Sequence, residues 1–191
     1  MNQTTKHLIK RPIKQNVVLS LYFVLFGFLG ACDGNTNLME QVISGNPVTV
    51  RLTLEQGAEV DERNNFGWTA LAHSAKQNKT AAMAVLLDAG ADINHQDDNG
   101  WTALMRAAAT GNVEATQLLL IRGANSGKTE KFGGTALFWA VYRNHRGIVT
   151  ELINSGADIN IKAKDGRTAL LIARNENYTK IIKLLESAGA E

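Results

Sequence analysis

The side chains that could serve as acids, bases or metal ligands are few and lie far apart in the sequence. Beyond residue 33 the histidines are His73, His95 and His145, and their spacing matches no three-histidine metal site. The adjacent carboxylates Asp97 and Asp98 fall in a polar segment rich in turn residues, where solvation of a loop is their expected role. No serine-nucleophile, zinc-protease, phosphate-loop or dinucleotide-binding motif occurs. We therefore expect no enzymatic activity, no cofactor and no metal ion.

Cys32 is the residue near the N-terminus for which a covalent chemistry can be predicted. It is the single cysteine of the chain, so it cannot form an intramolecular disulfide. A basic segment that ends at Lys14 and an apolar run over residues 17–29 precede it, which is typical of a bacterial export signal. The apolar run is shorter than the roughly 20 residues of a membrane-spanning helix. A retained signal anchor is the alternative.

The sequence LGAC at residues 29–32 resembles the bacterial lipobox, in which a precursor is cut before a cysteine that then carries lipid. The resemblance implies a signal peptide over residues 1–31, a lipidated N-terminus at residues 32–33, and Cys32 as the lipidation site. Asp33 resembles the residue that retains lipoproteins in the inner membrane of enteric bacteria. We expect a lipid-anchored protein that faces the periplasm, because several acyl chains, such as palmitate, hold a domain stably at a membrane.

The net charge depends on whether this first segment is removed. The full chain has 20 Lys and Arg against 18 Asp and Glu. Four of the basic residues lie within residues 1–31, so the mature chain has 16 against 18, a net charge of −2 with neutral histidine. We therefore expect no nucleic-acid partner, because such binding needs a basic surface. Translation from Met39 would remove the same segment and give a minor cytosolic form.

Nearly everything after residue 33 consists of five copies of one unit. Gly-Ala pairs recur every 33 residues without a slip, and a G-x-T-x-L pattern keeps the same period. A fixed period of this length predicts stacked supersecondary units and not a globule around one cleft. The pairs begin at Gly57, Gly90, Gly123, Gly156 and Gly189, and the threonines are Thr36, Thr69, Thr102, Thr135 and Thr168.

Each unit predicts two short helices followed by a polar connection. In the second copy Thr69 can cap the first helix, and Asn78 can end it because Asn and Gly tolerate a left-handed conformation. Met83, Leu86 and Leu87 are spaced as on one face of a second helix. Helices of roughly two to three turns are not stable alone in water, so stacking must bury these apolar faces. The sequence therefore predicts an all-α repeat solenoid.

These features resemble the ankyrin repeat. The residues that carry the resemblance are the G-x-T-A-L pattern, the Gly or Asn that ends the first helix, the leucine pair and G-A-D-I-N. The resemblance implies an ankyrin-repeat domain over residues 34–191. Its five stacked repeats would span about 34–66, 67–99, 100–132, 133–165 and 166–191.

The sequence departs from this pattern in a few places. Alanine stands where proline is usual, and the third copy reads N-S-G at residues 125–127 in place of D-I-N, so we expect that connection to be irregular. Thr53 and Glu186 replace leucine or isoleucine in the two end copies. Polar residues there predict outward-facing caps that complete the array.

In proteins with this repeat, the binding surface is formed by the hairpin tips and the exposed edge of each first helix. Aromatic and basic residues gather at the matching positions, and such residues are common at the hot spots of protein interfaces. An alternative is that Trp68 and Trp101 pack flat on neighbouring hairpins, while Trp139 is expected in the core. The predicted protein-binding residues are Phe66, Trp68, Lys76, Trp101, Lys131, Phe132, Tyr142, Arg143, Lys164 and Arg167.

The resemblance to bacterial ankyrin lipoproteins implies a membrane-tethered module that binds one protein partner and is monomeric when free. Proteins of this kind resemble immunity proteins, which neutralise antibacterial effectors such as secreted phospholipases of a type VI system by occlusion. The alternative function is a periplasmic adaptor or chaperone for an envelope enzyme, for example in oxidative-stress protection.

Overall fold

The computed structural model describes residues 34–191. The predicted signal peptide at residues 1–31, the predicted lipidation site Cys32 and the predicted sorting residue Asp33 lie outside the described residues. The chain divides into two units, residues 1–32 and 33–191, and the second contains every helix described below.

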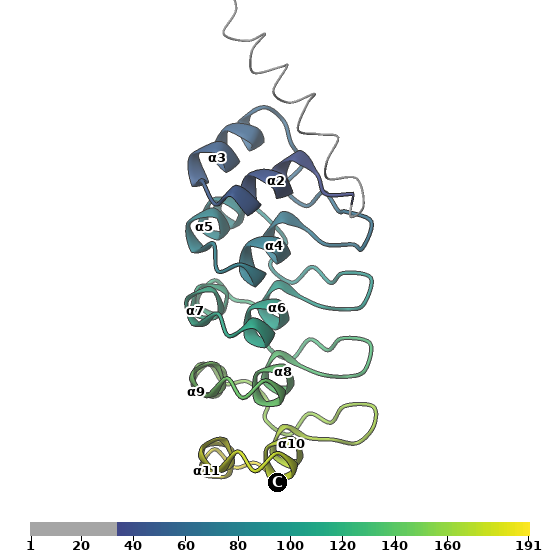
Figure 1. Ribbon diagram of the computed structural model, residues 1–191, viewed down its shortest axis with the longest axis vertical. Helices are drawn as coiled ribbons and strands as arrows, with labels where there is room; N and C mark the ends of the chain where they lie inside the picture. The colour runs from purple at the N-terminus through teal and green to yellow at the C-terminus, as the bar shows by residue number, and fades with distance from the viewer. Residues whose placement is uncertain (1–33) are drawn as a thin grey trace, which may run out of the picture. The chain divides into compact units, whose positions relative to one another are not determined.

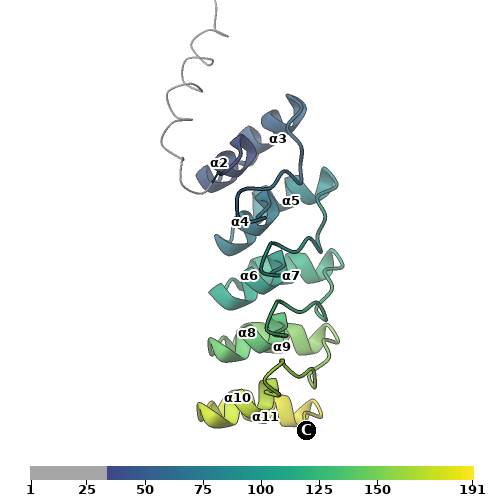
Figure 2. The ribbon, with the colours of Figure 1, turned by 90° about the vertical axis from the view of Figure 1, so that its right-hand side faces the viewer.

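Residues 34–191 form ten α-helices arranged as five consecutive pairs, without a strand (Figure 1). The first helices of the pairs make one column between the second helices and the hairpin loops, and the pairs follow one another as rungs (Figure 2). This is the predicted all-α repeat solenoid. The helices are α2 (Asn37–Ser44), α3 (Pro47–Glu55), α4 (Ala70–Lys76), α5 (Thr80–Asp88), α6 (Ala103–Thr110), α7 (Val113–Ile121), α8 (Ala136–Tyr142), α9 (Arg146–Asn154), α10 (Ala169–Asn175) and α11 (Thr179–Ser187).

The first helix of every pair begins and ends as the sequence predicts. In α4 the Thr69 hydroxyl accepts a hydrogen bond from the Ala72 backbone N–H at 3.4 Å, and the equivalent threonine caps each of the other four first helices. Asn78, Asn144 and Asn177 then adopt φ values of 56°, 59° and 57°, while Gly45 and Gly111 occupy the same position at 79° and 84°. Only residues that tolerate this left-handed conformation fit there.

The core runs continuously through the stack because each helix pair buries leucines against the next pair. Two rows of side chains show this, one from the first helices and one from the second helices. In the first row no residue is more than 2% exposed, and in the second none is exposed at all. Stacking therefore supplies the burial that the short helices lack alone. The rows are Leu38, Leu71, Leu104, Leu137 and Leu170, and Leu86, Leu119, Leu152 and Leu185.

The connection in the third repeat is regular, so the expected irregularity is wrong. The Asn125 backbone N–H donates to Asn94 Oδ1 at 2.8 Å, as the Asp92 N–H donates to Asp61 Oδ1 at 3.1 Å one repeat earlier. The Asn125 side chain also accepts from the Gly127 N–H at 2.9 Å. Asn125 thus keeps the acceptor that aspartate supplies in the neighbouring repeats, which preserves the turn.

The predicted polar caps are only partly correct. Thr53 does not face outward: it is 5% exposed, and its hydroxyl donates to the Thr49 carbonyl at 2.8 Å within α3. The outer surface of α3 instead exposes Val48 and Leu52. Glu186 is exposed as expected and lies 2.8 Å from the Arg174 guanidinium.

Among residues 34–191, none of the helices has the length and apolar character that crossing a bilayer requires.

Candidate protein-binding face

Arg106 is the centre of the candidate site. It projects from the fourth position of α6, and its guanidinium carbon lies 3.9 Å from the ring centroid of Trp68 and 4.6 Å from that of Trp101. Each tryptophan precedes the threonine that caps a first helix, so the two indoles come from neighbouring repeats. A cation between two indoles gains electrostatic attraction from both ring faces. Arg106 thereby joins two adjacent repeats across their hairpins.

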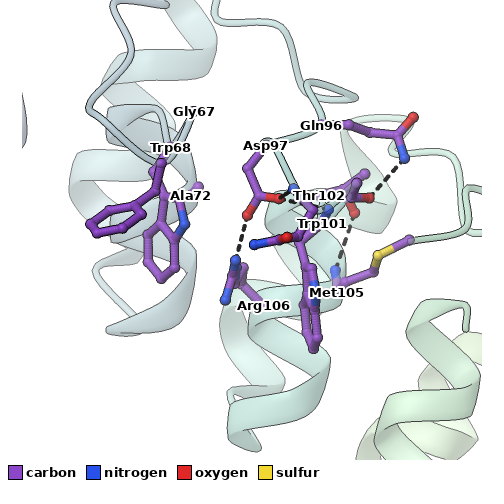
Figure 3. A network of polar contacts seen from close by, with 12 residues as sticks. Gly67, Trp68, Ala72, Gln96, Asp97, Trp101, Thr102, Met105 and Arg106 are labelled. Atoms are coloured by element: carbon purple, nitrogen blue, oxygen red, sulfur yellow. Dashed lines mark hydrogen bonds and ion pairs between the residues drawn. The ribbon is translucent and has the colours of Figure 1, made fainter. Parts of the chain in front are cut away.

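Asp97 holds both the side chain of Arg106 and the backbone of Trp101 in place (Figure 3). One carboxylate oxygen forms an ion pair with Arg106 Nη2, and the other accepts the backbone N–H groups of Asn99 at 2.8 Å and Trp101 at 3.0 Å. Burial lowers the pKa of Arg106 from its ordinary value, and the hydrogen bond and charge of Asp97 oppose that shift. The expected role of Asp97 as a solvated loop carboxylate is wrong, because its side chain is 2% exposed.

The same acceptor position orders the hairpins of three repeats. Asn64 Oδ1 accepts from the N–H groups of Phe66 and Trp68, both at 3.0 Å. Glu130 accepts from the N–H of Phe132 at 2.8 Å and from that of Gly134 at 2.9 Å. Asn64 and Glu130 are buried like Asp97, so each hairpin tip is fixed from within. This order limits the entropy that a partner must remove on binding.

Further aromatic rings continue the row toward the C-terminus. The ring centroids of Trp101 and Trp139 are 4.6 Å apart, and those of Trp139 and Tyr142 are 5.6 Å apart in an edge-on arrangement. Cations lie over the two ends, with Lys76 Nζ 5.0 Å from Trp68 and the Arg143 guanidinium 5.7 Å from Tyr142. We call this continuous row the aromatic–cation stripe. It consists of Lys76, Trp68, Arg106, Trp101, Trp139, Tyr142 and Arg143.

Gly134 explains why the third tryptophan comes from a helix. It occupies the position of Trp68 and Trp101 in the fourth repeat, but it has no side chain. A Cβ atom placed on Gly134 would lie 2.9 Å from Trp139 Nε1 and 2.9 Å from Glu130 Oε1. The indole of Trp139 therefore fills the space that the missing side chain leaves. Its Nε1 is buried and has no hydrogen-bond partner among the described residues.

The structure brings together five of the ten predicted binding residues in the stripe, namely Trp68, Lys76, Trp101, Tyr142 and Arg143. Trp68 and Trp101 are half-buried and not exposed, because they clamp Arg106. Neither the expected exposure nor flat packing on hairpins describes them fully. Trp139 packs against the core as expected, although one side joins the stripe.

The other five predicted residues lie beside the stripe. Phe66 and Phe132 are 49% and 74% exposed at the hairpin tips, and Lys131 and Lys164 are exposed next to them. Arg167 is exposed; its guanidinium pairs with Asp165 at 2.7 Å and lies 5.6 Å from the ring of Phe138. These side chains flank the stripe without forming one cluster with it.

Sequence reasoning missed Arg106 and the outer role of Trp139. The signal was present, because His73, Arg106 and Trp139 are spaced by 33 residues and share one position of the repeat. Trp139 was expected in the core, and an arginine at the same position of a neighbouring repeat would be costly there without a partner. Asp97 and the two indoles supply the partners.

The site presents cations and aromatic faces, which suit binding more than bond chemistry. No group of three or more His, Cys, Asp or Glu side chains within residues 34–191 is arranged to hold a metal ion. Trp, Tyr and Arg are enriched where interfaces carry most of their binding energy.

The comparisons with known proteins agree with this architecture. A family model described as ankyrin repeats (3 copies) matches residues 38–130 and 118–191, which together cover more than half of the chain. A comparison with curated proteins found no match. The ankyrin-repeat fold is typically a non-catalytic scaffold for protein–protein interaction. The chain belongs to the ankyrin-repeat family, and residues 34–191 are a protein–protein interaction module of that family.

Proposed function

We propose that this module is lipid-anchored through Cys32 and neutralises one protein partner, an antibacterial effector of the phospholipase class, by covering its active site or lipid entry. The observation that carries the proposal is the aromatic–cation stripe, which extends over three consecutive repeats. A partner that contacts the whole stripe meets several hot-spot residue types in one line.

The prior order of the stripe favours tight binding. Trp101 is held by Asp97, by the Arg106 guanidinium and by the ring of Trp139. Side chains that are already fixed lose little rotamer freedom when a partner docks, so more of the contact energy remains as affinity. Neutralisation of a toxin requires such affinity at low concentration.

The charges beside the stripe support a partner with an acidic patch. Lys131, Arg143 and Lys164 are exposed and form no ion pair within residues 34–191. Opposite charge on a partner would steer the encounter and fix its orientation.

Anchoring supports the choice of a lipase as the target. A lipase acts at a bilayer surface, and a binder tethered there through Cys32 would meet it at a high effective concentration. Asp33 favours the periplasmic face of the inner membrane under the enteric sorting pattern. The proposed mechanism is steric occlusion, and no bond in the effector is made or broken.

The test is capture followed by inhibition. Residues 33–191 contain the whole described core, so this part can be immobilised and incubated with native cell extract. We expect one dominant toxin or lipase whose purified activity falls to zero at a stoichiometric ratio. The variant Phe132→Ala/Arg143→Glu should lose the partner, because it removes one exposed aromatic ring beside the stripe and reverses the charge at the end of the stripe. Both side chains are exposed, so the core should remain intact. The matched control Ile121→Ala/Arg51→Glu changes an equally exposed pair on the second helices and should keep it.

Two results would contradict this proposal. Capture of an envelope enzyme whose activity rises in the complex would favour the adaptor function. Loss of the partner in the control as well as in the variant would remove the stripe as the binding site. For the anchor, Cys32→Ala should abolish acyl labelling and move the protein out of the membrane fraction.

A further inference from the structure

A groove between the second helices of the last two repeats carries an unusual charge. It lies between α9 and α11, has a volume of about 420 Å³, and is lined by three cations, two hydroxyls and one leucine. These helices belong to the opposite column from the hairpin loops, so the groove is separate from the aromatic–cation stripe (Figure 1). The lining residues are Arg146, Thr150, Lys180, Lys183, Leu184 and Ser187.

The three cations have no acidic partners. None of the ion pairs within residues 34–191 includes Arg146, Lys180 or Lys183. Lys180 and Lys183 are three residues apart on α11, a spacing at which like charges repel. The positive charge of the groove is therefore not neutralised by the chain itself.

The helix ends add to this positive charge. Arg146 is the first residue of α9 and Lys180 the second of α11, although the N-terminal turn of a helix favours anions. The N-cap residues of both helices, His145 and Tyr178, make no side-chain hydrogen bond to the first turn. The dipole of each helix thus adds partial positive charge at the end where Arg146 and Lys180 lie.

The repeat provides an internal comparison for the groove. The equivalent positions one repeat earlier contain no cation and one carboxylate, and those two repeats earlier have the same count. The first such set has one arginine and one aspartate. The excess of positive charge is therefore specific to the last groove and is not a property of the repeat. The earlier sets are Val113, Gln117, Gly147, Thr150, Glu151 and Asn154; Thr80, Ala84, Glu114, Gln117, Leu118 and Ile121; and Pro47, Arg51, Ala81, Ala84, Val85 and Asp88.

We propose that the α9–α11 groove binds a phosphate group, carried either by a small soluble ligand or by a lipid headgroup. A phosphate offers several anionic oxygens to the three cations. The hydroxyls of Thr150 and Ser187 already donate to the carbonyls of Arg146 and Leu184, at 3.1 Å and 2.8 Å, so the three cations are the groups that would hold the phosphate. Binding would offset the repulsion between Lys180 and Lys183. This site goes beyond the proposed neutralising function and is independent of it.

The test uses two probes and a charge-matched control. Inorganic phosphate is titrated into ¹⁵N-labelled residues 33–191 at constant ionic strength set with chloride, and amide shifts are followed by NMR. Vesicles of phosphatidylglycerol or phosphatidylcholine are tested by co-sedimentation. The groove variant is Lys180→Gln/Lys183→Gln, and the control Lys128→Gln/Lys162→Gln removes the same charge outside both proposed sites.

We expect phosphate to shift the amides at the starts of α9 and α11, and the groove variant to weaken binding about tenfold or more. The control should change it less than about twofold. Phosphate shifts with no vesicle binding would identify a soluble ligand, and binding to phosphatidylglycerol vesicles that the groove variant alone loses would identify a headgroup.

Three results would overturn the proposal: no response to either probe, shifts spread over the whole surface, or equal weakening in variant and control. A thermal melt shows whether the groove variant is folded. Removal of two like charges should leave its thermal midpoint unchanged or higher, so a lower midpoint would reveal misfolding as the cause of lost binding. Partner capture by the stripe should be intact in this variant, which separates failure here from failure of the proposed function.

Discussion

The guanidinium of Arg106 stacks 3.9 Å from the ring centroid of Trp68, although the two residues belong to different repeats. Contacts of this kind add side-chain coupling to the backbone links between hairpins, such as the 3.0 Å hydrogen bond from the Lys131 N–H to the Asn99 carbonyl. The stripe is therefore part of the interface between repeats as well as part of the proposed binding surface.

Replacement of Arg106 should destabilise the domain. Arg106→Ala removes two ring contacts and leaves the buried Asp97 carboxylate without its counter-ion, for an expected loss of about 2–4 kcal/mol in the free energy of unfolding. Urea denaturation followed by circular dichroism measures it. Arg122→Ala, which breaks an exposed pair with Asp88, is the control and should cost less than about 1 kcal/mol. Equal losses in the two variants would remove the special role of Arg106.

Gly134→Ala should displace Trp139. The added Cβ would lie 2.9 Å from the indole Nε1, so the ring must move, with an expected cost of about 1–3 kcal/mol. A changed near-ultraviolet circular dichroism spectrum would report the movement. In Gly147→Ala the nearest atom is 3.7 Å from the new Cβ, and this helical position should show no loss. An unchanged spectrum in Gly134→Ala would contradict the packing that we describe.

Charge reversal beside the stripe should slow partner association. Lys131→Glu/Arg143→Glu replaces two exposed cations without a buried contact, so we expect the association rate to fall about tenfold or more at low salt and the dissociation rate to change little. Surface plasmon resonance at several salt concentrations separates the two rates. Association that is as fast as in the parent protein, with the same salt dependence, would exclude an acidic patch on the partner.

Asp165 should titrate at lower pH than an ordinary aspartate. Its pKa is lowered mainly by the hydrogen bond from the Arg167 backbone N–H and then by the bond from the Arg167 side chain. A carboxyl with a lowered folded-state pKa stabilises the fold above its unfolded-state pKa and loses that contribution as pH falls through the folded value. NMR titration of the carboxyl carbon should show the midpoint rise in Arg167→Ala and stay constant in Arg174→Ala. An Asp165 midpoint that does not change in Arg167→Ala would refute the contribution of the Arg167 side chain to the lowered pKa.

A product that starts at Met39 should fold poorly. It would lack the Thr36 hydroxyl, which caps α2 through the Met39 N–H at 3.4 Å, and Leu38, which is 1% exposed in the core. The expected loss is about 3–6 kcal/mol, from the cap and from the buried leucine together. Thermal melts of residues 34–191 and 39–191 compare the two directly. Equal thermal midpoints would contradict the expected loss and would be consistent with a stable cytosolic form.

The repeat architecture could be predicted from the sequence because its determinants are local. The threonine cap and the Gly or Asn that ends each first helix act within one turn of backbone, and their 33-residue period makes the pattern unambiguous. The prediction of an irregular third connection was wrong because the turn also depends on a local determinant, a side-chain acceptor atom. Asn125 differs from aspartate in charge, but it keeps the acceptor atom that the turn uses.

The candidate site was harder to predict because it depends on contacts between repeats. Exposed residues such as Phe132 and Tyr142 could be assigned by position alone. The clamp could not, because the environment of Arg106 is formed by Trp68 from the preceding hairpin and by Asp97, whose burial no single repeat specifies.

The indole of Trp139 fills the space beside Gly134, where the two preceding repeats have a tryptophan, so the repeats are not equivalent and their order matters. Since the period is constant, removal of residues 100–132 would leave an intact backbone pattern, in which the second copy is followed directly by the fourth. Trp68 would then face the indole of Trp139 with no guanidinium between them. Ankyrin modules are often treated as interchangeable building blocks. Here, shuffling or duplication of single repeats would preserve the scaffold but would disrupt the contacts of the aromatic–cation stripe. New versions of this protein should therefore be engineered from blocks of at least two neighbouring repeats.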